Sequence, residues 1–236
     1  MRETASRVAS GCRLRRRGAM GRSNPGMATI HDWSLRRQEV LAQSQAGWPE
    51  HAGNQVYMDL VSGGRTEQTM RLVFLLFDQS PLAFANFYAL CTQSIDDVGE
   101  SGHMLTYRRS RVHRITKGRC LEAGDIVRGD GQGGDSLYGK SGFEDESFGL
   151  RLAHDQPGLL SMCSPPGVGK RSAFRISFGE MPDANGTDAV IGRLISGNIH
   201  LPTIEALPVD ASDAPARPLT IVECGAIAGW SKLPAP

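Results

Sequence analysis

The chain has 236 residues, of which 40% are hydrophobic, 22% charged and 6% aromatic, and 28 are glycine. These proportions are typical of a folded globular protein and exclude a disordered chain, a collagen-like repeat or a coiled coil. The longest apolar run, residues 72–77, is too short to cross a bilayer, so no membrane span is expected. The many glycines and few aromatic residues favour a turn-rich β protein.

Positive charge is concentrated at the N-terminus. Residues 1–26 hold seven arginines and one acidic residue, whereas acidic residues outnumber basic ones in the rest of the chain. Nucleic acid is therefore not an expected partner. Because this segment lacks the apolar core of a secretory signal, three interpretations stay open. It is a disordered basic tail, sequence upstream of a start at Met20 or Met27, or a mitochondrial presequence.

The five cysteines are scattered without CxxC spacing. Their odd number and the absence of a secretory signal predict reduced thiols in a reducing compartment. The predicted location is the cytoplasm, and the mitochondrion is the alternative if residues 1–26 are a presequence. The histidines lack the paired spacing of a metal site, so neither a metal nor another cofactor is expected.

Two segments are expected to flank the folded domain. Residues 27–53 form an extension with one short helix over residues 33–41, for which Asp32 is the predicted N-cap. Residues 229–236 form a short C-terminal tail. Residues 54–228 between them are predicted to be the domain itself.

The domain begins with strands. Residues 56–60 and 70–77 are predicted to pair as a hairpin, because glycines 63 and 64 mark a turn between them. Pro81 then opens a helix that continues to Cys91. Proline is favoured in the first turn of a helix because its missing N–H would have no partner there.

Short strands and glycine turns continue from this helix to residue 199. A second short helix is predicted over residues 202–207, and a closing strand over residues 219–224. Many short strands with two helices predict a closed antiparallel barrel with helical caps.

Three blocks of sequence carry a family resemblance. They are residues 72–92, which contain Phe77-Asp78-Gln79-Ser80-Pro81; residues 112–139, which contain Val112-His113-Arg114-Ile115 and Gly131-Gln132-Gly133-Gly134-Asp135; and residues 143–162, which begin Phe143-Glu144-Asp145-Glu146-Ser147-Phe148. In this order and spacing they are similar to the cyclophilin family of peptidyl-prolyl cis-trans isomerases. The resemblance covers residues 54–228.

The resemblance implies an all-β-dominated fold, an eight-stranded antiparallel closed β-barrel capped by two α-helices. This agrees with the elements predicted from the pattern of residues. It also implies a core position for seven matched residues, namely Phe77, Phe87, Leu90, Phe143, Phe148, Leu159 and Met162.

The chemistry implied by the resemblance is rotation about the peptide bond before proline. That bond has a rotational barrier of about 18–20 kcal/mol. In the family an arginine donates a hydrogen bond to the prolyl nitrogen as it becomes pyramidal, while an apolar pocket holds the proline ring. Arg114, directly after His113, aligns with this arginine, so the resemblance implies that the catalytic donor is retained.

The other aligned groove positions depart from the family pattern. Arg119 and Arg175 stand where the family has pocket phenylalanines, and Glu122 replaces the glutamine that positions the arginine. The remaining aligned positions are Cys120, Cys163, Ser164, Ala173, Asp183, Ala184 and Asp188. Apolar positions thus become charged or small, and the aromatic floor, which contributes roughly 1.5–3 kcal/mol to apolar binding, is missing.

Two functions follow from these residues. The first is a cyclophilin-like domain with a degenerate groove, a protein-binding or structural subunit of a larger assembly with little or no isomerase activity. Its expected partner is a protein or peptide, proline-containing or charged. The alternative is an active peptidyl-prolyl isomerase that assists protein folding, because Arg114 and the framework around it are retained.

Overall fold

The structure, a computed structural model, describes residues 37–39, 42, 54–63, 68–93, 98–164 and 168–227. Residues 37–39 and 42 are helical, and the rest of the predicted helix over residues 33–41 lies outside the described residues. The predictions for residues 1–26 and 229–236 lie outside them as well. In the described ranges no helix combines the length and the apolar character needed to span a membrane.

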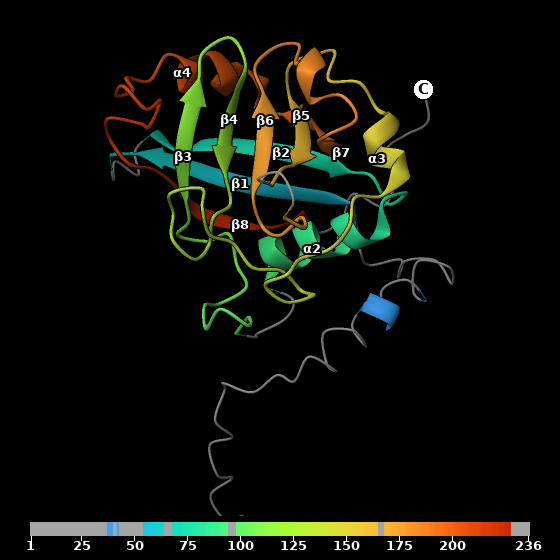
Figure 1. Cartoon of the computed structure of the whole chain (residues 1–236). Helices are drawn as coiled ribbons and strands as arrows, with labels where there is room; N and C mark the ends of the chain where they lie inside the picture. The colour runs from blue at the N-terminus through green and yellow to red at the C-terminus, as the bar shows by residue number, and fades with distance from the viewer. Residues whose placement is uncertain are drawn as a thin grey trace, which may run out of the picture.

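Eight antiparallel strands form a closed barrel in the order β1-β2-β7-β5-β6-β4-β3-β8 (Figure 1). The strands are β1 (Gln55–Ser62), β2 (Met70–Leu76), β3 (Arg111–Thr116), β4 (Cys120–Ala123), β5 (Leu159–Met162), β6 (Phe174–Ser177), β7 (Ala189–Ser196) and β8 (Leu219–Ala226). The predicted barrel is confirmed. The predicted hairpin is β1 and β2, which pair antiparallel.

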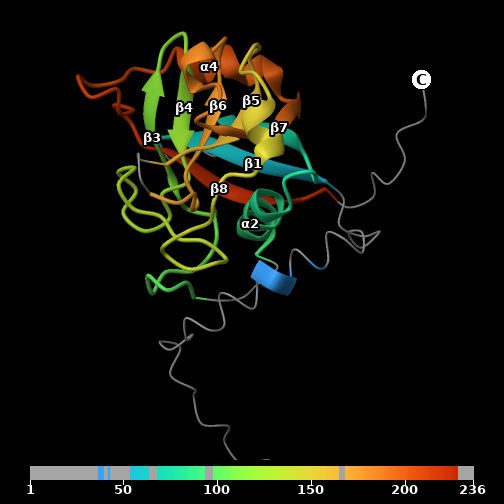
Figure 2. The same ribbon diagram turned by 45° about the vertical axis from the view of Figure 1, so that its right-hand side comes forward.

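Helices cover the barrel on opposite sides. The helix α2 (Pro81–Thr92) lies at the lower side and α4 (Leu201–Glu205) at the upper side (Figures 1 and 2). Two 3₁₀ helices, η2 (Pro182–Ala184) and η3 (Asn198–His200), precede β7 and α4. The sequence predicted α2 and a second helix close to α4, whereas the short helix α3 (Ser147–Arg151) was not predicted.

The N-terminus of α2 is held by a carboxylate from another part of the chain. Ser80 occupies the N-cap position but makes no capping hydrogen bond with its side chain. Instead, the carboxylate of Glu146 accepts hydrogen bonds from the N–H groups of Leu82 and Ala83, at 3.0 and 3.1 Å. These are two of the N–H groups that a helix leaves without internal partners. The contact ties α2 to the segment that leads into α3.

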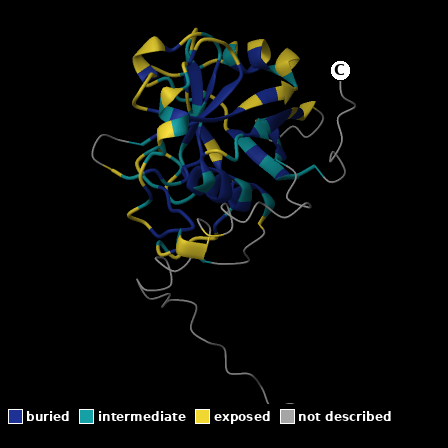
Figure 3. Cartoon of the chain, turned by 90° about the vertical axis from the view of Figure 1, so that its right-hand side faces the viewer, coloured by how far each residue is buried: buried dark blue, intermediate teal, exposed yellow. Residues whose placement is uncertain are grey.

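Alternation along the strands separates the core from the outer face of the barrel. In β6, Phe174 and Ile176 are buried, whereas Arg175 between them points outward. Phe174 packs against Phe87 of α2 and against Tyr107, with ring centroids 5.3 and 5.1 Å apart. Buried residues accordingly fill the barrel and the inner side of α2 (Figure 3).

Five of the seven predicted core residues are buried, namely Phe87, Leu90, Phe143, Leu159 and Met162. Phe77 and Phe148 are only partly buried. Their rings contact each other edge to face, with centroids 6.4 Å apart. For these two residues the expected core position is corrected to a contact at the margin of the barrel, where α3 packs near the end of β2.

Candidate functional site

The strand register places several predicted site residues in one row on the outer face of the barrel. Arg114 of β3 lies opposite Glu122 of β4, and Glu122 lies opposite Arg175 of β6. Arg175 in turn lies opposite Ser161 of β5. Directly opposed residues of antiparallel strands share a face and have Cβ atoms about 4.5–5.5 Å apart. The side chains of this row are therefore neighbours, although they are far apart in the sequence.

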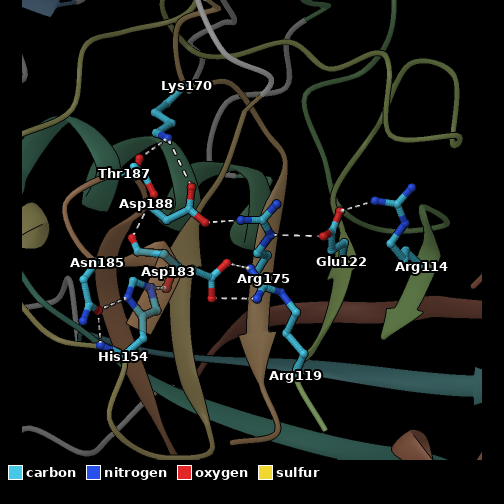
Figure 4. Close-up of polar contacts among 12 residues, drawn as sticks. Arg114, Arg119, Glu122, His154, Lys170, Arg175, Asp183, Asn185, Thr187 and Asp188 are labelled. Carbon is cyan, nitrogen blue, oxygen red and sulfur yellow. Dashed lines mark hydrogen bonds and ion pairs between the residues drawn. The ribbon is translucent and has the colours of Figure 1, made fainter. Parts of the chain in front are cut away.

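The row continues into a ladder of alternating charges, the charged ladder, made of Arg114, Glu122, Arg175, Asp188 and Lys170 (Figure 4). The Nε of Arg175 donates to Oε1 of Glu122 at 3.1 Å, and its Nη1 donates to Oδ2 of Asp188. The Nζ of Lys170 lies 3.7 Å from Oδ1 of Asp188. Arg175 thus bridges two carboxylates, and each carboxylate also faces a second cation.

Lys170 forms the buried end of the charged ladder. It is only 5% exposed, and its Nζ donates to the carbonyl oxygen of Thr187 at 3.1 Å. The same nitrogen lies 3.3 Å from Oδ2 of Asp145. A buried ammonium group is stable only when it is paired and hydrogen-bonded. Asp145 and Asp188 provide that pairing.

The charges in the ladder change the protonation of its members. Burial opposes ionisation of Glu122, but His113 and the positive charges of Arg175 and Arg114 outweigh it and lower the pKa of Glu122 to about 2. Burial likewise opposes the charge of Arg175, yet the neighbouring carboxylates raise the pKa of its guanidinium. Both groups are therefore ionised at neutral pH, and the ladder is a set of ion pairs.

Arg114 forms the exposed end of the charged ladder and contacts it only weakly. Half of its side chain is exposed, and its Nη1 lies 3.9 Å from Oε2 of Glu122. On the side away from Arg175, it lines a pocket of about 390 Å³ together with Pro215 and Pro218. Its guanidinium therefore keeps donors free, whereas that of Arg175 is engaged on both sides.

A second pocket, of about 530 Å³, lies over the other end of the ladder. Its lining includes five of the predicted site residues, Arg119, Ser164, Arg175, Asp183 and Asp188, as well as Ala184. Arg119 and Asp183 pair across this pocket through two hydrogen bonds of 2.7 and 2.6 Å. Charged groups dominate the lining, and Val168, which is 39% exposed, is its main apolar side chain.

Four predicted groove residues line neither pocket, namely Glu122 of the charged ladder, Cys120, Cys163 and Ala173. Cys120 is fully buried and packs with Met181 and Ala184, and Cys163 is also buried. Burial raises the pKa of the Cys120 thiol to about 11 and that of Cys163 to about 12, so both thiols are neutral. The expectation that these two cysteines face the groove is corrected: they lie beneath it. Ala173 is partly buried and contributes its carbonyl oxygen to the N–H of Cys163.

Some residues of this region were not singled out by sequence reasoning. Lys170 joins the ladder from a loop, and Asp145 and Thr187 contact it from other loops, so neither strand alternation nor spacing could have placed them there. A buried pair also extends the row of Arg175, because Ser161 contacts His154, with 2.7 Å between Oγ and Nε2. His154 contacts Asn185 through its other ring nitrogen (Figure 4). Both Ser161 and His154 are fully buried, so a substrate cannot reach them.

The described residues contain no cluster of three histidine, cysteine or acidic side chains placed to hold a metal ion. The chemistry that the site offers is hydrogen bonding and charge. Arg114 can donate to a bound peptide, and the pocket over Arg175 presents both signs of charge.

Comparisons with known proteins agree on one family. Residues 63–226 match the family described as cyclophilin type peptidyl-prolyl cis-trans isomerase/CLD. The chain is 34% identical over 178 residues to "Peptidyl-prolyl cis-trans isomerase D" of Mycosarcoma maydis, covering 74% of this chain and 44% of that protein. It is 35% identical over 151 residues to "Peptidyl-prolyl cis-trans isomerase 9" of Caenorhabditis elegans, covering 64% and 48%. The chain spans less than half the length of these relatives.

Proposed function

Because the chain belongs to the cyclophilin family of peptidyl-prolyl isomerases, we propose that it is a cyclophilin-like domain that binds a protein partner and has little or no isomerase activity. The observation that carries this proposal is the position of Arg175. Its guanidinium lies between Glu122 and Asp188, on the strand where the family resemblance implies an aromatic pocket floor.

An ion pair is a poor floor for a proline ring. The ring binds by removing apolar surface from water, and covering the charged groups of Arg175 and Asp188 with it would remove their solvent without giving them a new partner. Ring binding would have to displace or cover these groups. A loss of about 4 kcal/mol in transition-state stabilisation corresponds to roughly a thousandfold loss in rate. This reasoning supports weak catalysis.

The same groups suit a different ligand. The pocket over Arg175 carries both cations and carboxylates, with Arg119 and Asp183 on its rim. A peptide with charged side chains can form new ion pairs with Arg119 and Asp183, whereas an apolar peptide cannot. We therefore expect a charged segment of a partner protein in this pocket, consistent with a subunit of a larger assembly.

An active isomerase is the alternative, and one observation favours it. Arg114 is half exposed and lies 3.9 Å from its nearest carboxylate, so its donors are available to a prolyl nitrogen. If the proline ring were held by other contacts, this residue could still stabilise the twisted peptide bond.

NMR exchange spectroscopy on X-Pro peptides, including acidic ones, distinguishes the two functions. We expect the wild type at high concentration to accelerate cis–trans exchange no more than Arg114→Ala does. Exchange that is fast with the wild type and lost in Arg114→Ala would establish the isomerase instead. Separate spectra of the isotope-labelled protein report binding: peptide-induced shifts at Ser164, Val168 and Thr187 without faster exchange support a binding groove, and no shifts with any charged peptide contradict it.

A further inference from the structure

A third concave surface lies apart from the pocket over Arg175. It has a volume of about 570 Å³ and is lined by the loop before β3 and the loop after β4. Four arginines line it, Arg108, Arg109, Arg111 and Arg128, and we call this surface the arginine pocket. It extends toward the pocket beside Arg114, because Arg111 lines both.

The charge of the arginine pocket is only partly neutralised. Arg108 pairs with Glu223 and Arg128 with Asp130, both at 2.7 Å between exposed groups. Within the described residues, Arg109 and Arg111 are exposed and have no carboxylate within 4.0 Å. The exposed ion pairs of Arg108 and Arg128 contribute little to stability, so both arginines can exchange their carboxylate for another anion. The pocket is therefore positive on balance.

The carboxylate that lines this pocket is not available to neutralise the arginines. Asp125 is 1% exposed, and its oxygens accept hydrogen bonds from backbone N–H groups of its own loop. Those contacts outweigh the effect of burial and lower its pKa to about 2. Asp125 shapes the loop that carries Arg128, and its charge is satisfied there.

Arg109 has an unusual backbone conformation. Its φ is +70°, in the left-handed region that side chains other than glycine rarely adopt. Its N–H donates to the carbonyl oxygen of Ile221 at 2.7 Å, which holds the turn against β8. A glycine would adopt this conformation without strain. A large charged side chain at a position that suits glycine points to a role in binding rather than in the fold.

The lining also contains apolar groups. Ile126 and Val127 are partly buried in the floor, and Met104 is 43% exposed at the edge. A concave, positive site with an apolar floor fits a peptide that combines carboxylates with an apolar side chain. A nucleic-acid strand fits less well, because acidic residues outnumber basic ones in the chain beyond residue 26.

We propose that the arginine pocket binds an acidic segment of a partner protein, with carboxylates on Arg109 and Arg111 and an apolar side chain over Ile126 and Val127. The proposal shares with the proposed function only the expectation of a protein partner. It concerns a different pocket, and its test reads binding without an isomerase assay, so either can fail while the other stands.

The test uses fluorescence anisotropy with a labelled peptide of glutamate and aspartate residues around one leucine. We expect the full chain to bind it, with an affinity that falls as salt rises. Arg111→Gln and Arg109→Gly should each weaken binding about fivefold. Arg193→Gln, which removes an exposed arginine of β7 outside the pocket, is the matched control and should leave binding unchanged. The same peptide with glutamine and asparagine should not bind.

Thermal unfolding separates this role from a structural one. Arg109→Gly should bind more weakly although its melting temperature is unchanged or higher, because glycine relieves the strained conformation. Binding that survives both pocket substitutions, or that the control weakens equally, would overturn the proposal. Tighter binding of a labelled single-stranded oligonucleotide than of the acidic peptide would assign the pocket to nucleic acid instead.

Discussion

Arg175 is the residue on which the charged ladder depends. It is the shared partner of Glu122 and Asp188, whose side chains are mostly buried, 13% and 6% exposed. Without it, the carboxylate of Asp188 would keep Lys170 at 3.7 Å, and that of Glu122 would keep His113 at 3.7 Å and the half-exposed Arg114 at 3.9 Å. Breaking a buried pair costs more than the pair contributes, because the remaining charge stays buried.

We therefore predict that Arg175→Ala lowers the free energy of unfolding by about 3 kcal/mol, measured by urea denaturation. Arg119→Gln is the control. It breaks a pair whose members are 34% and 62% exposed, and exposed pairs contribute less than about 1 kcal/mol. Equal losses for the two variants would mean that the ladder does not depend on Arg175.

Glu122 gives the ladder a pH dependence. Its pKa in the folded protein is about 2, below the ordinary value of 4.5, so the folded state holds its proton less tightly than the unfolded state. The stabilisation is fully present above the unfolded pKa and is lost as pH falls through the folded pKa. We predict that unfolding free energy declines between about pH 5 and pH 2 and that the decline is shallower in Glu122→Gln. Identical slopes for the two proteins would contradict this.

At the scale of elements, the loop after β4 is organised by one side chain. The carboxylate of Asp125 accepts hydrogen bonds from the N–H groups of Val127, Arg128, Asp130, Gly131 and Gly133. A carboxamide offers one acceptor oxygen in place of two. We predict that Asp125→Asn lowers the free energy of unfolding by about 2 kcal/mol, whereas Asp155→Asn, at an exposed position, changes it by less than about 0.5 kcal/mol. A negligible effect of Asp125→Asn in urea denaturation would show that the loop keeps its conformation without these hydrogen bonds.

The elements that the sequence predicted share a local signal. Strand β2 is a nearly continuous apolar run, and α2 begins at a proline after a turn, so both could be located from a few neighbouring residues. The helix α3 has five residues and only Gly149 is buried in it, which leaves little periodicity to detect. Its position depends on Glu146 reaching across to α2, a contact between distant parts of the chain.

The site was predictable only where it lies on strands. The family resemblance pointed to Arg114, Glu122 and Arg175, and the barrel register brings them into one row. Lys170 comes from a loop whose path depends on tertiary contacts, so its place at the end of the ladder could not be predicted. Cys120 was misplaced for a related reason. On β4 it shares a face with Glu122, but Met181 and Ala184 cover it, and alternation alone cannot reveal that cover.

At the scale of the whole molecule, core and site occupy opposite faces of the same strands. Phe174 and Ile176 fill the barrel, while Arg175 between them carries the ladder on the outside. Substitutions in the ladder therefore do not alter the side chains that fill the barrel. This separation allows the proposed loss of catalysis to be tested by reversing it, since residues can be exchanged in the ladder without remaking the barrel.

The triple variant Glu122→Gln, Arg175→Phe and Asp188→Asn removes the three central charges of the ladder, leaves Arg114 and Lys170, and provides an aromatic floor beside Arg114. We predict that its cis–trans exchange of X-Pro peptides, measured by NMR, is at least about tenfold faster than that of the wild type. Adding Arg114→Ala should abolish the gain, because that guanidinium is the remaining donor for the prolyl nitrogen. Near-UV circular dichroism shows whether the variant is folded. A folded triple variant with no gain would mean that the ion pairs at Arg175 are not what limits catalysis, and the limit would then lie in residues 168–188, which contribute Val168, Asp183 and Thr187 to the same pocket.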